Sequence, residues 1–154
     1  MSIPMNQSSV HKSILVPASC ELVWKKWTTS QGLKSFIGVD NLVELVPGGP
    51  YEIYFLMDNP PGLRGGEGNK VLSFLPHQML SFTWNAPPSI PEVRNHDHKT
   101  WVVIQMESLG NSETQVTLDH LGWLDGHAWD ETRQYFENAW DVVFSALIES
   151  CSAE

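Results

Sequence analysis

The stretch WDETRQYFENAWDVVFSALIESC, residues 129–151, carries the clearest structural signal in the chain. Its large apolar residues recur at spacings of three, four and seven, the period of one face of an α-helix. They are Trp129, Phe136, Trp140, Val143, Phe144 and Leu147. Polar residues mark the opposite face, namely Asp130, Gln134, Glu137, Asp141 and Ser145. The pattern predicts one long amphipathic helix, on the order of 33 Å long, whose apolar stripe another layer must cover.

The chain before this helix supplies that layer. A first strand is predicted at 11–16, followed by a helix that Ser19 caps and a second short helix at 33–36. Turn residues then separate six strands into three hairpins, 42–46 with 51–56, 70–75 with 79–84, and 100–107 with 114–121. This order predicts an α+β domain over residues 10–151, with an antiparallel sheet facing one helix and a flexible tail at 1–9.

Size and charge restrict the function classes. The 154 residues fit one domain, and 42% of them are hydrophobic, as expected of a globular chain. The formal net charge of −9 argues against binding nucleic acid or an anionic membrane surface, because both need a basic face. No apolar run is long enough to span a membrane and no signal peptide is apparent, so we expect a cytoplasmic protein with reduced cysteines.

Alternate residues of a strand share one face of the sheet, which predicts the side chains that point toward the long helix. The predicted inward rows include Val102 with Ile104, and Phe82 with Trp84. His120 ends the inward row of its strand. Large rings in such rows either fill the interior or line a hollow, and composition does not decide between the two outcomes.

Five segments in order resemble the START-like (SRPBCC) superfamily. They are V-P-A-S-x-E-x-V-W (16–24), P-G-G-x-Y (47–51), G-N-K-V-L-S-F-L-P-x-x-x-L-S-F-T-W (68–84), T-x-V-T-L-x-H-x-G-W (114–123) and W-x-x-x-x-x-Y-F-x-x-A-W (129–140). Within the superfamily they are similar to the domains named for the activator of the heat-shock-protein ATPase, and W-N-A-P-P-x-x-P-E-V-R (84–94) resembles a bacterial subgroup.

The resemblance implies a helix-grip fold, in which a curved seven-stranded antiparallel sheet wraps around the long C-terminal helix. It also implies an apolar cavity between sheet and helix, covered by the connections at 58–69 and 85–99. It carries over no catalytic residue, and one fold of this kind serves several functions.

The predicted ligand-binding residues are the inward rings and their neighbours. They are Phe36, Tyr51, Ile53, Phe55, Phe82, Trp84, Val102, Ile104, His120, Trp123, Trp129, Phe136 and Trp140. His120 is the only catalytic candidate, as an acid or base at the cavity wall. It is also interpretable as a histidine hydrogen-bonded to the loop between its strand and the helix.

Other reactive groups favour structural interpretations. The His96-Asp97-His98 run has metal-ligand chemistry but no assured further ligand, so an exposed loop and no metal site are predicted. Cys20 begins a helix, where a thiol pKa can fall, but no histidine is spaced beside it. Arg94 either meets an acidic ligand group or anchors its loop to a carboxylate. No nucleotide-binding motif is present, and no cofactor is expected.

Three functions follow from these observations. The leading hypothesis is binding of a small hydrophobic molecule between sheet and helix. The second is an enzyme, of cyclase, dehydratase or hydrolase type, that uses His120 on a hydrophobic substrate. The third is a protein-interaction domain that associates with a chaperone, as the family name suggests, and a homodimer through an open sheet edge is a separate possibility.

Overall fold

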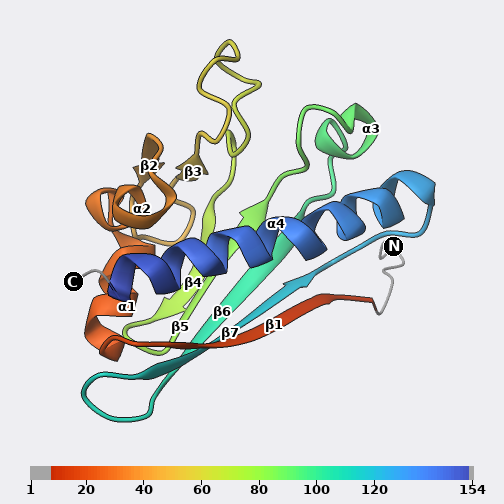
Figure 1. Cartoon of the computed structure of the whole chain (residues 1–154). Helices are drawn as coiled ribbons and strands as arrows, with labels where there is room; N and C mark the ends of the chain where they lie inside the picture. Colours follow the sequence, from red (N-terminus) through yellow and green to blue (C-terminus); the bar gives the residue numbers. More distant parts are fainter. Residues whose placement is uncertain (1–7, 153–154) are drawn as a thin grey trace.

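The structure is a computed structural model that describes residues 8–152. Figure 1 shows one long helix lying across one face of an antiparallel sheet, with two short helices packed at one end. The elements are β1 (Val10–Val16), α1 (Cys20–Thr28), α2 (Ser30–Ile37), β2 (Asn41–Val43), β3 (Tyr51–Ile53), β4 (Val71–Leu75), β5 (Met79–Trp84), α3 (Pro91–Arg94), β6 (Thr100–Ser108), β7 (Thr114–Leu121) and α4 (His127–Ser152). The predicted α+β class and the helix-grip arrangement are confirmed.

The main sheet has the strand order β1-β7-β6-β5-β4, and every neighbouring pair is antiparallel. The register of β6 and β7 pairs Val102 with His120 and Ile104 with Leu118. All four side chains are fully buried, and the residues between them are only partly so. The alternation therefore turns the predicted inward row toward α4.

The predicted seven-stranded sheet is wrong in one respect. The seven strands are present, but β2 and β3 form a separate two-stranded sheet. A bridge between Pro50 and Lys70, with the bond from the Tyr51 N–H to the Asn69 carbonyl (2.8 Å), joins this pair to the start of β4. β2 and β3 are also shorter than predicted, ending at Val43 and Ile53. Pro50 has no N–H to extend the ladder, which limits this pairing.

The helices agree with the capping signals. The Ser19 hydroxyl accepts a hydrogen bond from the Leu22 N–H (3.2 Å), as predicted for the start of α1. α2 is longer than the predicted 33–36, because Thr29 caps it through the Gly32 N–H (2.9 Å). The connection at 85–99, expected to lack regular structure, contains the single turn α3, which begins with Pro91.

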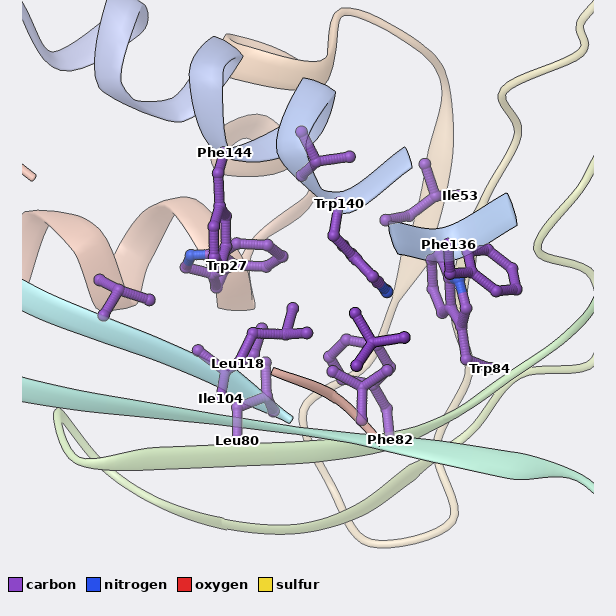
Figure 2. Packing of buried hydrophobic residues seen from close by; sticks show 14 of the residues in the cluster. Trp27, Ile53, Leu80, Phe82, Trp84, Ile104, Leu118, Phe136, Trp140 and Phe144 are labelled. Atoms are coloured by element: carbon purple, nitrogen blue, oxygen red, sulfur yellow. The ribbon is translucent and has the colours of Figure 1, made fainter. Parts of the chain in front are cut away.

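Aromatic side chains fill the centre of the space between sheet and helix (Figure 2). Tyr51 stacks on Phe82 with ring centroids 4.2 Å apart, and Trp27 meets Phe144 edge-on at 6.3 Å. Leu80 and Ile104 beneath them are fully buried. The sequence did not decide whether the interior is filled or hollow. In this central part the structure shows that it is filled.

Within residues 8–152, no helix combines the length and the apolar character that crossing a membrane requires.

Candidate ligand-binding pocket

An open pocket of about 300 Å³ lies at one side of α4, under the two long connections. Its lining comes from α4, the end of β5 and both connections. The lining residues are Phe55, Leu56, Gly65, Trp84, Asn85, Pro87, Pro88, Tyr135, Phe136, Ala139, Trp140, Val142 and Val143. In Figure 1 the loop before β4 and the α3 segment both project beyond α4, on the side opposite β1.

The pocket is apolar from its floor to its mouth. Trp84, Phe136 and Trp140 are buried and form the floor, and the rings of Trp84 and Trp140 lie 5.2 Å apart. At the mouth, Val142 is 70% exposed and Tyr135 is 47% exposed. Among the described lining residues, none carries a charged side chain.

Arg94 holds the two connections against each other. Its buried guanidinium donates to the carbonyls of Ala86 (2.7 Å), Gly65 (2.8 Å) and Gly62 (2.8 Å). Because Gly65 and Ala86 lie on different connections, one side chain joins both walls of the pocket. The sequence left two roles open for Arg94, contact with an acidic ligand group and anchoring of its loop. These hydrogen bonds correspond to the loop anchor.

Glu67 completes this anchor. Its carboxylate accepts hydrogen bonds from the backbone N–H groups of Gly62, Arg64 and Gly65, and it pairs with Arg94 at 3.2 Å. Burial opposes the ionisation of Glu67, but the backbone N–H groups outweigh burial, so its pKa lies below the usual value. The loop is therefore organised around a carboxylate that stays charged at neutral pH.

His120 lies in the core, where both of its ring nitrogens take part in a series of hydrogen bonds. The Trp140 indole N–H donates to Nδ1 (3.1 Å), which leaves the proton on Nε2. Nε2 then donates to the Thr100 hydroxyl (2.8 Å), and that hydroxyl donates to the Trp84 carbonyl (3.0 Å). Burial lowers the pKa of His120 to about 3, so the ring is neutral at pH 7.

Four predicted ligand-binding residues line the pocket, namely Phe55, Trp84, Phe136 and Trp140. The structure places the others in the packed interior or at its ends, outside the lining: Phe36, Tyr51, Ile53, Phe82, Val102, Ile104, His120, Trp123 and Trp129. Trp123, one of these residues, donates its indole N–H to the His120 carbonyl (2.9 Å).

Sequence reasoning missed most of the rim. Tyr135, a ring with one hydroxyl, and the apolar Val142 are seven positions apart, outside the stripe that the helical period selects. Their spacing of two helical turns, off the main apolar stripe, was the signal available for them. Asn85, Pro87 and Pro88 lie on a connection that was predicted to cover the cavity, but no pattern showed which of its residues face inward.

The remaining reactive groups have structural contacts. His98 is within hydrogen-bond distance of the Gly122 carbonyl (2.6 Å), and His96 packs edge-on against Trp129. Across residues 8–152 there is no cluster of three or more His, Cys, Asp or Glu suited to a metal ion. The Cys20 thiol donates to the His77 carbonyl (2.9 Å), and burial raises its pKa, opposite to the shift that activates a thiol.

The sequence of residues 17–150 matches the family described as activator of Hsp90 ATPase homolog 1-like protein. The chain belongs to this family. None of the curated proteins matches its sequence.

Solved structures share the fold at low identity. A protein from Mesorhizobium loti has a TM-score of 0.74 at 16% identity, covering 95% of this chain and 98% of its own. The Aha1 dimer from Colwellia psychrerythraea has a TM-score of 0.68 at 22% identity, covering 94% and 96%. An HSP90 activator from Plasmodium falciparum has a TM-score of 0.64 at 15% identity, covering 86% of each chain.

The buried neutral His120 makes stability depend on pH. Its pKa is about 3 in the folded state and about 6.5 when unfolded, so its contribution is present above pH 6.5 and falls as the unfolded chain takes up the proton. We expect a loss of about 2 kcal/mol in the free energy of unfolding between pH 7 and pH 5 from this residue. Urea unfolding of the native protein and of His120→Gln should differ by that amount in their pH dependence.

The matched control is His127→Gln, which changes an exposed histidine on α4. It should retain the pH dependence of the native protein. An equal pH dependence in the native protein and in His120→Gln would show that His120 takes up a proton in the folded state.

Replacing Arg94 with Gln should release both walls of the pocket. The carbonyls of Gly62, Gly65 and Ala86 lose a charged donor, and Glu67 loses its partner. We expect a loss of about 3 kcal/mol in the free energy of unfolding and faster amide hydrogen exchange at 62–67 and 85–88. Lys25→Gln, on the exposed face of α1, is the control and should change neither quantity. Native-like exchange of both segments in Arg94→Gln would contradict the anchor.

Proposed function

We propose that this protein binds a small hydrophobic molecule in the pocket beside α4. The observation that carries the proposal is the pocket itself, with a floor of buried rings and an uncharged lining. Its volume, about 300 Å³, is at the lower end of the range found for small-molecule sites. The Arg94 anchor supports the proposal, because walls held in place before binding lower the entropic cost of binding.

Binding without catalysis fits the lining better than an enzymatic role. The pocket residues within the described chain include no Asp, Glu, His, Lys, Arg or Cys to act as acid, base or nucleophile. His120, the only candidate of this kind, has both ring nitrogens hydrogen-bonded within the core and lies outside the lining. We therefore place the enzyme hypothesis second to ligand binding.

Association with a chaperone is a second candidate function. The family description and the Plasmodium falciparum neighbour, an HSP90 activator, favour it, and so do the exposed apolar groups of Tyr135 and Val142. Retention of a purified HSP90-type chaperone by the immobilised protein would support this role. A homodimer, as in the Colwellia psychrerythraea structure, and a cytoplasmic location also stay predictions.

Filling the pocket from α4 should abolish binding. Ala139 lines the pocket and is partly buried, so Ala139→Phe places a ring in the space that a ligand needs. We expect the native protein to bind pyrene, an uncharged apolar probe, and Ala139→Phe to bind it at least tenfold more weakly. Pyrene fluorescence titration measures both affinities, and native mass spectrometry of the purified protein detects any molecule already bound.

The control variant is Ser145→Phe, which adds a ring to an exposed position of the same helix. It should bind pyrene as the native protein does. If the native protein does not bind pyrene and carries no molecule, or if both variants bind equally, the pocket is not the site.

A further inference from the structure

Of the lining residues within 8–152, Asn85 alone has a side-chain amide, and it lies directly after β5, beside Trp84. The other polar side chain of the lining, Tyr135, is at the exposed mouth. A ligand that enters past Tyr135 therefore meets one polar side chain among rings and aliphatic groups. In such a pocket a single polar group fixes the orientation of the ligand.

The amide of Asn85 has one chemically permitted orientation. Its Oδ1 atom accepts from the Ala86 N–H (3.0 Å) and from Lys99 Nζ (3.3 Å). Ala86 N–H can only donate, so the face turned toward it must be the oxygen and not the NH₂ group. Among residues 8–152, no acceptor takes a hydrogen bond from Asn85 Nδ2.

Lys99 is itself held in place, which keeps the amide from rotating. Its Nζ donates to the Arg94 carbonyl at 2.6 Å, and Arg94 is fixed by both connections. Burial lowers the pKa of Lys99, the nearby Arg94 guanidinium lowers it further, and Asp97 opposes the shift. Asn85 thus has the amine of Lys99 at its oxygen, and this contact polarises the Asn85 N–H groups as donors.

The rest of the lining restricts the ligand further. An ionised ligand would enter a site without a charged side chain in its lining, and an unpaired buried charge is costly. Flat rings suit the walls, because Trp84, Phe136 and Trp140 present aromatic faces and edges within one pocket.

We propose that the ligand is an uncharged, flat, ring-containing molecule whose carbonyl-type oxygen accepts a hydrogen bond from Asn85 Nδ2. This inference rests on the proposed function and specifies the ligand class of the same pocket. It assigns Asn85 as the residue that favours a ligand with a hydrogen-bond acceptor over a bare hydrocarbon, whereas the uncharged lining disfavours an anion.

A series of probes on one ring skeleton tests the proposal. Fluorene has no oxygen, 9-fluorenone has a carbonyl, 9-fluorenol has a hydroxyl, and fluorene-9-carboxylate has a negative charge. Isothermal titration of the native protein should give fluorenone about tenfold tighter binding than fluorene, the gain of one hydrogen bond from Asn85 Nδ2. Fluorene-9-carboxylate should bind most weakly.

The substitution Asn85→Asp replaces the hydrogen-bond-donating NH₂ group with an accepting oxygen and keeps the side-chain volume nearly constant. Its carboxylate only accepts hydrogen bonds, so the advantage of fluorenone over fluorene should disappear and fluorenol should bind more tightly than fluorenone. Asn138→Asp makes the same charge change at an exposed position of α4 and should keep the native order of affinities. Unchanged fluorene affinity in Asn85→Asp shows that the pocket is still folded.

The outcomes separate this proposal from the proposed function. If fluorene and fluorenone bind equally well to the native protein, or if Asn85→Asp keeps the preference for fluorenone, the role of Asn85 is wrong and apolar binding stands. Tightest binding of fluorene-9-carboxylate would also overturn it, in favour of an anionic ligand. If no member of the series binds and pyrene does not bind, the proposed function fails and this inference fails with it.

Discussion

One helix must cover the inner face of a five-stranded sheet, and most of the structure follows from that constraint. A single α-helix is about 10 Å wide, so large side chains are needed to fill the space beneath it. Trp27, Phe82 and Phe144 do so in the centre (Figure 2). Where the connections replace the sheet as the opposite wall, side chains do not fill the whole space beside α4, and the pocket lies there.

The connections form a defined wall because a charged group organises them. Glycine and proline are frequent at 58–69 and 85–99, and neither connection has enough apolar residues to pack as a core of its own. Arg94 donates to carbonyls on both connections, and Glu67 accepts from the backbone of one of them. Arg94 is buried and Glu67 partly buried, and their ion pair is accompanied by hydrogen bonds to the backbone, which is the condition under which such a pair can be kept.

The sequence predicted the elements better than the pocket, for a physical reason. Helical and strand periods report which side chains face the interior, and they placed Trp84, Phe136 and His120 correctly inside. The periods do not report which part of an interior stays unfilled, because this depends on ring packing and loop conformation. The separation of β2 and β3 from the main sheet, to which only the Pro50–Lys70 bridge and the bond from Tyr51 to Asn69 connect them, is a similar tertiary effect.

His120 and Asn85, two polar side chains beside the aromatic floor, have opposite roles. His120 uses both ring nitrogens to join α4 to β6, through Trp140 and Thr100. Neither nitrogen is therefore free to bond a ligand. Asn85 uses only its oxygen, toward Ala86 and Lys99, and its NH₂ group has no acceptor among the described residues. A buried polar group that is fully paired, such as His120, stabilises the fold. The partly buried Asn85, whose NH₂ group meets no acceptor among the described residues, can donate a hydrogen bond to a ligand in the pocket. In this fold the side chain able to bind a ligand is therefore the one with a donor that the fold does not use, and not the one whose pKa is shifted most.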